Sequence, residues 1–388
     1  MKNHLILILL SIFSFSAFSQ KIITKKYESE ELQDVRTLHI YLPKGYEKDS
    51  ITNYPLAIVL GSEYLFDLYI GNSTLFSHTE KAPKQIIVGI EMTSTRFKDT
   101  SFDETKNSSL TASGKSFMQF IKEEMLPYVE GTFKTSPFLT IVGEGTSANF
   151  LTHFLQDDAP IFNTYICLNP LFSPDISILM ESYNLNKLST IDNTYYFYFN
   201  DSTFINKENQ ERIVLLNEYL ESLSIKNFNI KYDFLKDSPS YVSGISEGIP
   251  RAFDTVFEIY SGINKEEFET KIKDLSPLDA IYYLENKYIE IDYLFGSNLG
   301  IREADVIAIE RIVLEKENGD HLKTFGEMIL KLYPYSPLGH YYIGRYYESG
   351  KNYNRALKQY RLGYSKMDPS DPNADKFYLN VQRMLRKG

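Results

Sequence analysis

The sequence predicts an α/β protein with a mostly parallel sheet covered by helices, followed by an all-α region. Three observations support this prediction. Short, continuously apolar segments such as 54–60 are typical of strands that are buried on both faces. From residue 54 to residue 260 such segments alternate with segments of helical spacing, the order that generates a parallel sheet. From Ser261 onward the sequence shows helical spacing and no strand pattern.

Composition narrows the range of functions. The chain has 388 residues, of which 43% are hydrophobic, enough for more than one domain with a buried core. The formal net charge is −10 and there is no basic block, so nucleic acid is not an expected partner. We find no phosphate-binding loop, dinucleotide fingerprint or metal-ligand spacing, and therefore expect no cofactor and no metal ion. None of the histidines beyond residue 20 is paired at such a spacing: His39, His78, His153, His321 and His340.

The N-terminus has the pattern of a targeting segment. Lys2 supplies a positive start, residues 5–15 are apolar, and Ala17-Phe18-Ser19 forms a small-x-small cleavage site before Gln20. We therefore predict a signal peptide over residues 1–19 and a periplasmic or secreted product without a membrane span. Cys167, the only cysteine, lies in an apolar segment, so neither a disulfide nor a lipid-anchor cysteine is expected.

The elements of the α/β region follow from their spacing. Residues 34–42 alternate and predict an antiparallel strand, whereas the polar segment 93–112 predicts a long loop. Buried strands are expected at 54–60, 85–90, 138–142, 164–168, 194–199 and 229–235. Helices are expected at 67–76, 114–133, 146–155, 211–223 and 250–260.

The helical region begins with a capping pair, Ser276-Pro277, and carries a repeat pattern. Helical spacing occurs at 278–284, 303–314, 321–333, 337–348, 353–366 and 374–385. Within 337–369 the offsets of a tetratricopeptide unit are matched by Ile343, Gly344, Tyr347, Ala356, Tyr360 and Gly363. The helix before Pro334 would belong to a degenerate preceding repeat. Repeats of this kind build concave surfaces for a peptide or protein partner, and the alternative is a generic helical cap on the sheet domain.

Several ordered motifs of the α/β region resemble one known family. They are Tyr54-Pro55-Leu56-Ala57-Ile58-Val59-Leu60 with Phe66-Asp67, Thr95-Arg96-Phe97-Lys98-Asp99-Thr100, Phe117-Met118-Gln119-Phe120-Ile121, Gly143-Glu144-Gly145-Thr146-Ser147 and Asn169-Pro170. Over residues 30–260 the chain resembles the esterase D and enterochelin esterase-like branch of the α/β-hydrolase superfamily. The resemblance implies an α/β-hydrolase domain at 20–260, followed by a helical, tetratricopeptide-like domain at 262–388.

The resemblance also implies a serine nucleophile in a Gly-x-Ser-x-Gly turn, a histidine base and an acid. In this chain Gly145 stands at the nucleophile position and Ser147 at the second glycine. The position that aligns with the histidine is Tyr241, or Pro239 after a shift. Asp201 stands at the end of the strand that would carry the acid, as a remnant or as a capping residue.

These replacements indicate an esterase-like protein that binds rather than cleaves. A serine hydroxyl needs a neighbouring base, and a tyrosine with a pKa near 10 is mostly protonated at neutral pH. Backbone N–H groups of Thr146 and of the loop at Gly61 and Ser62 would still form an oxyanion pocket for a small carbonyl or carboxylate ligand. The alternative is an active carboxylic-ester hydrolase whose nucleophile is Ser147, Thr146 or Ser246, the last in a second Gly-x-Ser-x-Gly match at 244–248. A third hypothesis is that the hydrolase domain only presents the helical tail.

Overall fold

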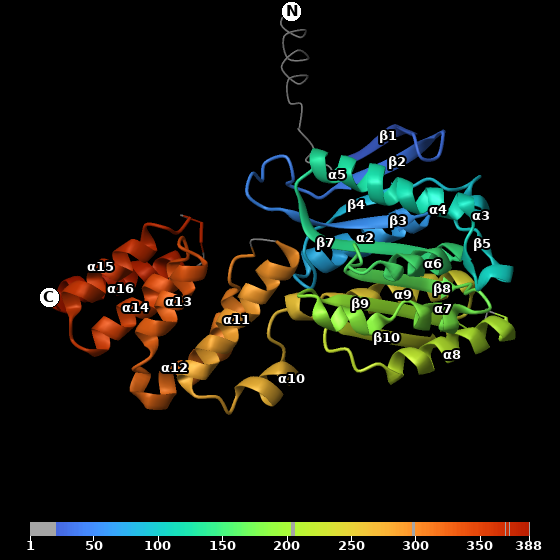
Figure 1. Cartoon of the computed structure of the whole chain (residues 1–388). Coiled ribbons are helices and arrows are strands. Elements are labelled where there is room, and N and C mark those ends of the chain that lie inside the picture. The colour runs from blue at the N-terminus through green and yellow to red at the C-terminus, as the bar shows by residue number, and fades with distance from the viewer. Residues whose placement is uncertain (1–20, 203–205, 297–298, 369, 372, 388) are drawn as a thin grey trace, which may run out of the picture. The chain divides into compact units, whose positions relative to one another are not determined.

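The computed structural model describes residues 21–202, 206–296, 299–368, 370–371 and 373–387 (Figure 1). The predicted signal peptide therefore lies outside the described residues. The chain divides into two compact units. We call residues 21–75, with 84–135 and 139–252, the α/β unit. Residues 76–83 and 136–138, with residues from 253 onward, form the helical unit.

The α/β unit is built on an eight-stranded sheet in the order β1-β2-β4-β3-β7-β8-β9-β10. Strands β1 and β2 are antiparallel to their neighbours, and all pairs from β4 to β10 are parallel. The strands are β1 (Lys21–Ser29), β2 (Asp34–Leu42), β3 (Tyr54–Leu60), β4 (Ile86–Ile90), β7 (Thr135–Gly145), β8 (Thr164–Pro170), β9 (Tyr195–Ser202) and β10 (Phe228–Leu235). The predicted fold class is confirmed.

Helices cover both faces of this sheet (Figure 1). On one face a largely aromatic core, with Phe117, Phe150 and Phe199, packs beneath α4, α6, α7 and α8. On the other face Phe66 of α2 packs against Gly89 of β4, where a Cβ atom would lie 2.7 Å from the ring. The helices are α2 (Leu65–His78), α4 (Ala112–Gln119) continued by a π-helical turn (Phe120–Met125) and α5 (Leu126–Thr132), α6 (Thr146–Leu151), α7 (Ile176–Ser182), α8 (Lys207–Ser222) and α9 (Tyr241–Val256). The uninterrupted burial of β3 explains its uninterrupted apolar sequence.

Two expectations about this unit were wrong. The expected loop at 93–112 contains short elements, namely α3 (Arg96–Asp99), β5 (Phe102–Asp103), a 3₁₀ turn (Glu104–Lys106) and β6 (Ser109–Leu110). A buried ion pair holds this segment to the sheet, because Arg36 Nη2 lies 2.8 Å from Asp99 Oδ1. The last helix begins at Tyr241 and not at Pro250, which lies inside α9. Ser240 stabilises this earlier start, since its hydroxyl accepts a hydrogen bond from the Ser243 N–H at 3.1 Å.

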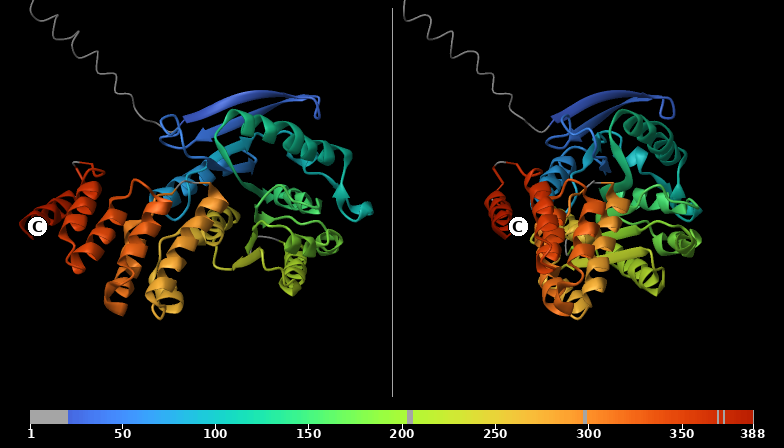
Figure 2. Two further views of the ribbon diagram at one scale, coloured as in Figure 1. Left: turned by 60° about the vertical axis from the view of Figure 1, so that its left-hand side comes forward. Right: turned by 90° about the vertical axis from the view of Figure 1, so that its left-hand side faces the viewer.

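The helical unit consists of successive antiparallel helices (Figure 2). Ser276 caps α11 as predicted, because its side chain accepts a hydrogen bond from the Asp279 N–H. The elements are a 3₁₀ turn (Glu258–Tyr260), α10 (Lys265–Glu267) with a π-helical turn (Phe268–Ile272), α11 (Pro277–Phe295), α12 (Glu303–Glu315) with a 3₁₀ turn (Lys316–Gly319), α13 (Leu322–Leu332), α14 (Pro337–Ser349), α15 (Tyr353–Tyr364) and α16 (Ala374–Lys387). Among the described residues, no helix is both long enough and apolar enough to cross a membrane.

Glycines allow the last three helices, α14, α15 and α16, to approach one another closely. A Cβ atom on Gly344 of α14 would lie 2.6 Å from the Tyr360 ring of α15. A Cβ atom on Gly363 of α15 would lie 2.5 Å from the Phe377 ring of α16. A larger residue at either position would separate the helices or displace the ring.

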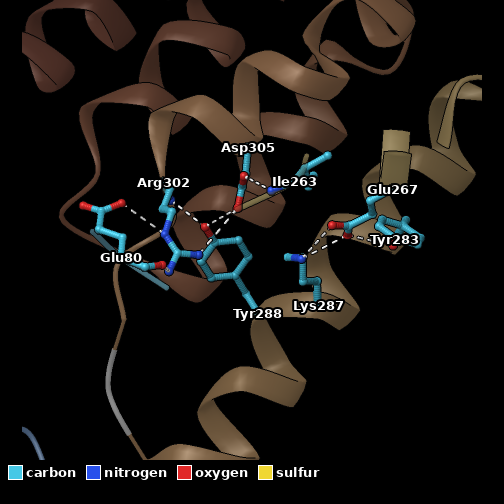
Figure 3. Close-up of polar contacts among 8 residues, drawn as sticks. All are labelled: Glu80, Ile263, Glu267, Tyr283, Lys287, Tyr288, Arg302 and Asp305. Atoms are coloured by element: carbon cyan, nitrogen blue, oxygen red, sulfur yellow. Dashed lines mark hydrogen bonds and ion pairs between the residues drawn. The ribbon is translucent and has the colours of Figure 1, made fainter. Parts of the chain in front are cut away.

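Buried charges tie together the first helices of the helical unit (Figure 3). Tyr288 of α11 donates a 2.8 Å hydrogen bond to Asp305 of α12, and Asp305 also accepts one from the Ile263 N–H at 2.7 Å. Lys287 of α11 lies 3.0 Å from Glu267 of α10, and both side chains are largely buried. Because every charge in Figure 3 faces an opposite charge or a hydrogen-bond partner, these contacts fix α10 and α12 against α11.

Candidate functional site

The turn between β7 and α6 is the strand-turn-helix expected from the sequence. Gly145 at its apex has φ +56° and ψ −121°. Side chains other than glycine rarely adopt this backbone conformation, so glycine relieves strain at this position. Gly143 allows the helix to pack on the strand, because a Cβ atom there would lie 2.8 Å from the Ser147 carbonyl carbon.

The Glu144 carboxylate, beside the apex, accepts hydrogen bonds from three side chains in distant parts of the chain. Glu144 is 5% exposed. Its carboxylate accepts hydrogen bonds from the Tyr64 hydroxyl at 2.8 Å and from the Tyr241 hydroxyl at 2.5 Å. The Arg96 guanidinium forms a third, very short contact with the same carboxylate. We call Glu144, Tyr64, Tyr241 and Arg96 the Glu144 cluster.

The Glu144 cluster continues to a second carboxylate. Arg96 Nη2 lies 2.9 Å from Glu63 Oε2, and the Thr93 hydroxyl donates to Glu63 Oε1 at 2.8 Å. Burial opposes ionisation of Glu63, but hydrogen bonds from its own backbone N–H and Thr93, together with Arg96, outweigh burial and lower its pKa. The cluster with Glu63 thus contains one permanent cation and two carboxyl groups.

Tyr241 occupies the space directly above the turn. Its hydroxyl oxygen lies 3.4 Å from the position that a Cβ atom on Gly145 would take. Burial is the largest cause that raises the pKa of Tyr241 well above its usual value, and the negative charge of Glu144 and the hydrogen bond to it add to this effect. The phenol therefore stays protonated and acts as a hydrogen-bond donor, not as a base.

Two asparagines hold Tyr241 in place. Asn169, at the end of β8, donates from its side-chain amide to the Tyr241 carbonyl at 2.8 Å. Asn200, near the end of β9, donates in turn to the Asn169 side-chain oxygen at 3.0 Å. Gly244 permits this contact, since a Cβ atom there would lie 2.8 Å from the Asn169 amide nitrogen. The first turn of α9 is thereby anchored to the carboxyl ends of two strands.

The expectation that the backbone N–H groups of Gly61 and Ser62 are oxyanion donors was wrong. Both backbone N–H groups donate to the Ile90 carbonyl, each at 3.1 Å. The Arg96 guanidinium lies against this loop, with Nη2 2.5 Å from the position of a Cβ atom on Gly61. The loop borders the Glu144 cluster, but these two N–H groups are already used by the sheet.

The alternative nucleophiles are poorly placed. Ser147 is fully buried, and its hydroxyl has no hydrogen-bond partner among the residues that the structure describes. Thr146 is half-buried in the first turn of α6. The second Gly-x-Ser-x-Gly match, which contains Ser246, lies within α9 and not in a strand-turn-helix. Gly248 of this match packs on the sheet, where a Cβ atom would lie 2.7 Å from Leu168.

Asp201 is buried near the end of β9. Burial raises its pKa to about 6, although a hydrogen bond from the Ser202 backbone opposes this shift. One carboxylate oxygen of Asp201 has no partner among the described residues.

The sequence did not reveal the members of the Glu144 cluster other than Tyr241. Arg96 and Glu144 stand inside two of the motifs that carry the family resemblance, but nothing in their spacing predicted that they meet. Tyr64 and Glu63 follow β3, and no sequence signal identified them. No described group of three His, Cys, Asp or Glu side chains is arranged to hold a metal ion.

The sheet order, the covering helices and the turn at Gly145 define an α/β-hydrolase fold. Residues 29–169 match the family model described as "Putative esterase", which confirms the expected resemblance for this segment. No curated protein matches the sequence.

Solved structures extend the likeness in fold. An uncharacterised protein from Capnocytophaga ochracea is 21% identical, with a TM-score of 0.80 over 94% of this chain and 100% of the other. An IroE-like serine hydrolase from Shewanella oneidensis is 16% identical, with a TM-score of 0.56 over 89% of this chain and 100% of the other. BES protein from Bacillus cereus is 16% identical, with a TM-score of 0.53 over 61% of this chain and 96% of the other. At these identities the similarity concerns the fold.

Proposed function

We propose that this chain is an exported, esterase-like protein that has lost hydrolytic activity and acts by binding a partner. The observation that carries the proposal is the pair at the turn. Gly145 offers no side chain for attack, and the group facing it is the protonated phenol of Tyr241. A serine-type acyl transfer requires both a nucleophile and a base at these positions.

The Glu144 cluster supports the same conclusion. An acyl substrate would need free donors above the turn to stabilise its developing negative charge. Here the side-chain donors Arg96, Tyr64 and Tyr241 already bind Glu144. A small carbonyl or carboxylate ligand above Gly145 stays a prediction, and it would have to displace the Glu144 carboxylate.

Partner binding is assigned to the helical unit. Its helices α14 and α15 bear the tetratricopeptide-like offsets, and Gly344 packs against Tyr360 as such paired helices require. The signal-peptide pattern at 1–19 supports export to the periplasm or beyond. Mass measurement of the exported product should give a chain that begins at Gln20.

Ester hydrolysis tests the proposal. Purified mature protein should hydrolyse p-nitrophenyl acetate and butyrate no faster than a Gly145→Ala variant, and a fluorophosphonate should not label it. Hydrolysis above that control, together with labelling that is lost in Ser147→Ala, Thr146→Ala or Ser246→Ala, would establish the alternative of an active carboxylic-ester hydrolase.

A further inference from the structure

The helical unit contains a groove between α14, α15 and α16, three helices that lie side by side (Figure 2). Its volume is about 610 Å³. The lining includes Tyr341, Arg345 and Glu348 of α14, Tyr360 of α15, and Asn380 and Arg383 of α16. These side chains combine aromatic rings with charged and amide groups, a mixture suited to a polar ligand with some apolar contact.

Arg345 is a cation without an anionic partner in the part of the chain that the structure describes. It is half-buried, and it forms no hydrogen bond or ion pair with any described residue. Its guanidinium lies over the Tyr341 ring, 5.8 Å from the ring centroid, and Lys376 lies over the same ring at 4.8 Å. An aromatic ring leaves the five N–H donors of the guanidinium free for a carboxylate.

Asn380 supplies a second, independent sign of a ligand. It is only 7% exposed and lies on the buried face of α16 with Phe377, Val381 and Met384. Its side-chain amide makes no hydrogen bond with the residues that the structure describes. Because this amide lines the groove and has no partner among the described residues, its donors and acceptor are available to a ligand there. An amide offers one acceptor and two donors, which matches the backbone of a peptide.

The groove already binds one carboxylate of the protein itself. Glu348 accepts from Arg383 at 3.0 Å and 2.6 Å, from Tyr360 at 2.9 Å and from Lys387 at 3.2 Å. Burial would raise the pKa of Glu348, but the hydrogen bonds from Arg383, Tyr360 and Lys387 outweigh it and lower that pKa. Arg383 and Lys387 share the single anion Glu348, and Arg345 lines the same groove unpaired, which leaves a local positive charge in a chain whose net charge is −10.

We propose that this groove binds an extended peptide segment through an aspartate or glutamate side chain. The ligand carboxylate pairs with Arg345, and Asn380 bonds to the peptide backbone beside it. The inference rests on the proposed function, because it specifies the partner of the helical unit. The bound group is a side-chain carboxylate, by analogy with Glu348, and so a free C-terminus is not needed.

Fluorescence anisotropy with a labelled peptide tests the assignment. The probe is a fluorescein-labelled, C-terminally amidated peptide of four Ser-Glu pairs, and its control has Gln in place of every Glu. Mature full-length protein should bind the Glu peptide saturably and the Gln peptide at least about tenfold more weakly. Binding of the Glu peptide should also weaken as sodium chloride rises from 50 to 300 mM, values chosen to shorten the screening length about twofold.

Variants connect the binding to the groove. Arg345→Gln should weaken binding at least about tenfold, and Asn380→Ala about threefold or more. Arg345→Lys should retain more affinity than Arg345→Gln, since it keeps the charge. The matched control is Arg386→Gln, an exposed arginine of α16 outside the groove lining, which should change affinity less than about twofold. Thermal melts by circular dichroism confirm that each variant is folded.

Four results would overturn the inference. They are no binding of the Glu peptide, equal binding of the Gln peptide, equal loss in Arg345→Gln and Arg386→Gln, or binding only to a peptide with a free C-terminal carboxylate. The ester assay separates this failure from failure of the proposed function. Hydrolysis would contradict the proposed loss of activity in the α/β unit, whereas a negative peptide result without hydrolysis would remove only the groove assignment.

Discussion

Removing the cation of the Glu144 cluster is the sharpest test of how the site is built. Arg96 contacts both Glu144 and Glu63, whose side chains are 7% and 25% exposed. In an Arg96→Met variant the two carboxylates would remain close together without a cation. Breaking a buried ion pair by removing one partner costs about 3–5 kcal/mol. Because the Arg96 side chain is 21% exposed, water can partly replace it, and we expect Arg96→Met to lower the free energy of unfolding by about 2–3 kcal/mol.

The measurement is urea-induced unfolding of the mature protein, followed by far-UV circular dichroism because the chain contains no tryptophan. Lys98→Met, an exposed lysine of the same short helix, is the control and should change stability by less than about 0.5 kcal/mol. Adding Glu144→Gln to Arg96→Met should recover at least about 1 kcal/mol, since it removes the unpaired charge. Equal effects of Arg96→Met and Lys98→Met, or additive losses in the double variant, would refute the reasoning.

Three further predictions concern packing and pH. Gly344→Ala should lower the free energy of unfolding by about 1–3 kcal/mol, because its Cβ would lie 2.6 Å from the Tyr360 ring. Gly350→Ala, whose Cβ would lie 3.7 Å from the nearest atom, the Tyr346 carbonyl oxygen, is the matched control and should have a much smaller effect in the same urea titration. Burial raises the pKa of Asp201 from 3.8 to about 6, so the folded state holds the proton more tightly and wild-type stability should fall as pH rises from about 4 to 6. The free energy of unfolding of Asp201→Asn, measured relative to wild type, should therefore be up to about 3 kcal/mol higher at pH 8 than at pH 4. The same difference at both pH values would contradict this prediction. Burial lowers the pKa of His153 from 6.5 to about 4, so the unfolded state takes up the proton first and stability should fall as pH drops through this window. His153→Gln should show the opposite trend to Asp201→Asn, because its stability relative to wild type should be greater at pH 4 than at pH 8. Parallel trends in the two variants would contradict the assigned pKa shifts.

The sequence predicted the bounds of helices and strands well where these depend on residues close together in the chain. The segment 54–60 became β3 and 34–42 became β2 without a shift of either end. The cap at Ser276 was also confirmed. The start of α9 was missed because Pro250 was taken as a helix start. Tertiary packing decides otherwise, since Ile245 and Ile249 are fully buried on the sheet at helical spacing.

The candidate site was predictable only in part. Gly145 and Tyr241 were identified from a motif and an aligned position, and the structure brings Tyr241 directly above Gly145. The donor role of Gly61 and Ser62 was wrong, because the identity of a hydrogen-bond acceptor depends on how the loop meets β4. Nothing in the sequence showed that Arg96 would cross this loop to reach Glu144.

The sequence by itself determined the fold class and the identity of the residue at the apex of the turn, because both depend on short-range patterns along one strand and its following helix. The tertiary structure alone decided what surrounds Gly145. Tyr64, Arg96, Glu144 and Tyr241 are far apart in the chain and meet only because the carboxyl ends of parallel strands share one edge of the sheet. A buried carboxylate is stable only with such donors around it, so their convergence fixes the chemistry above the turn.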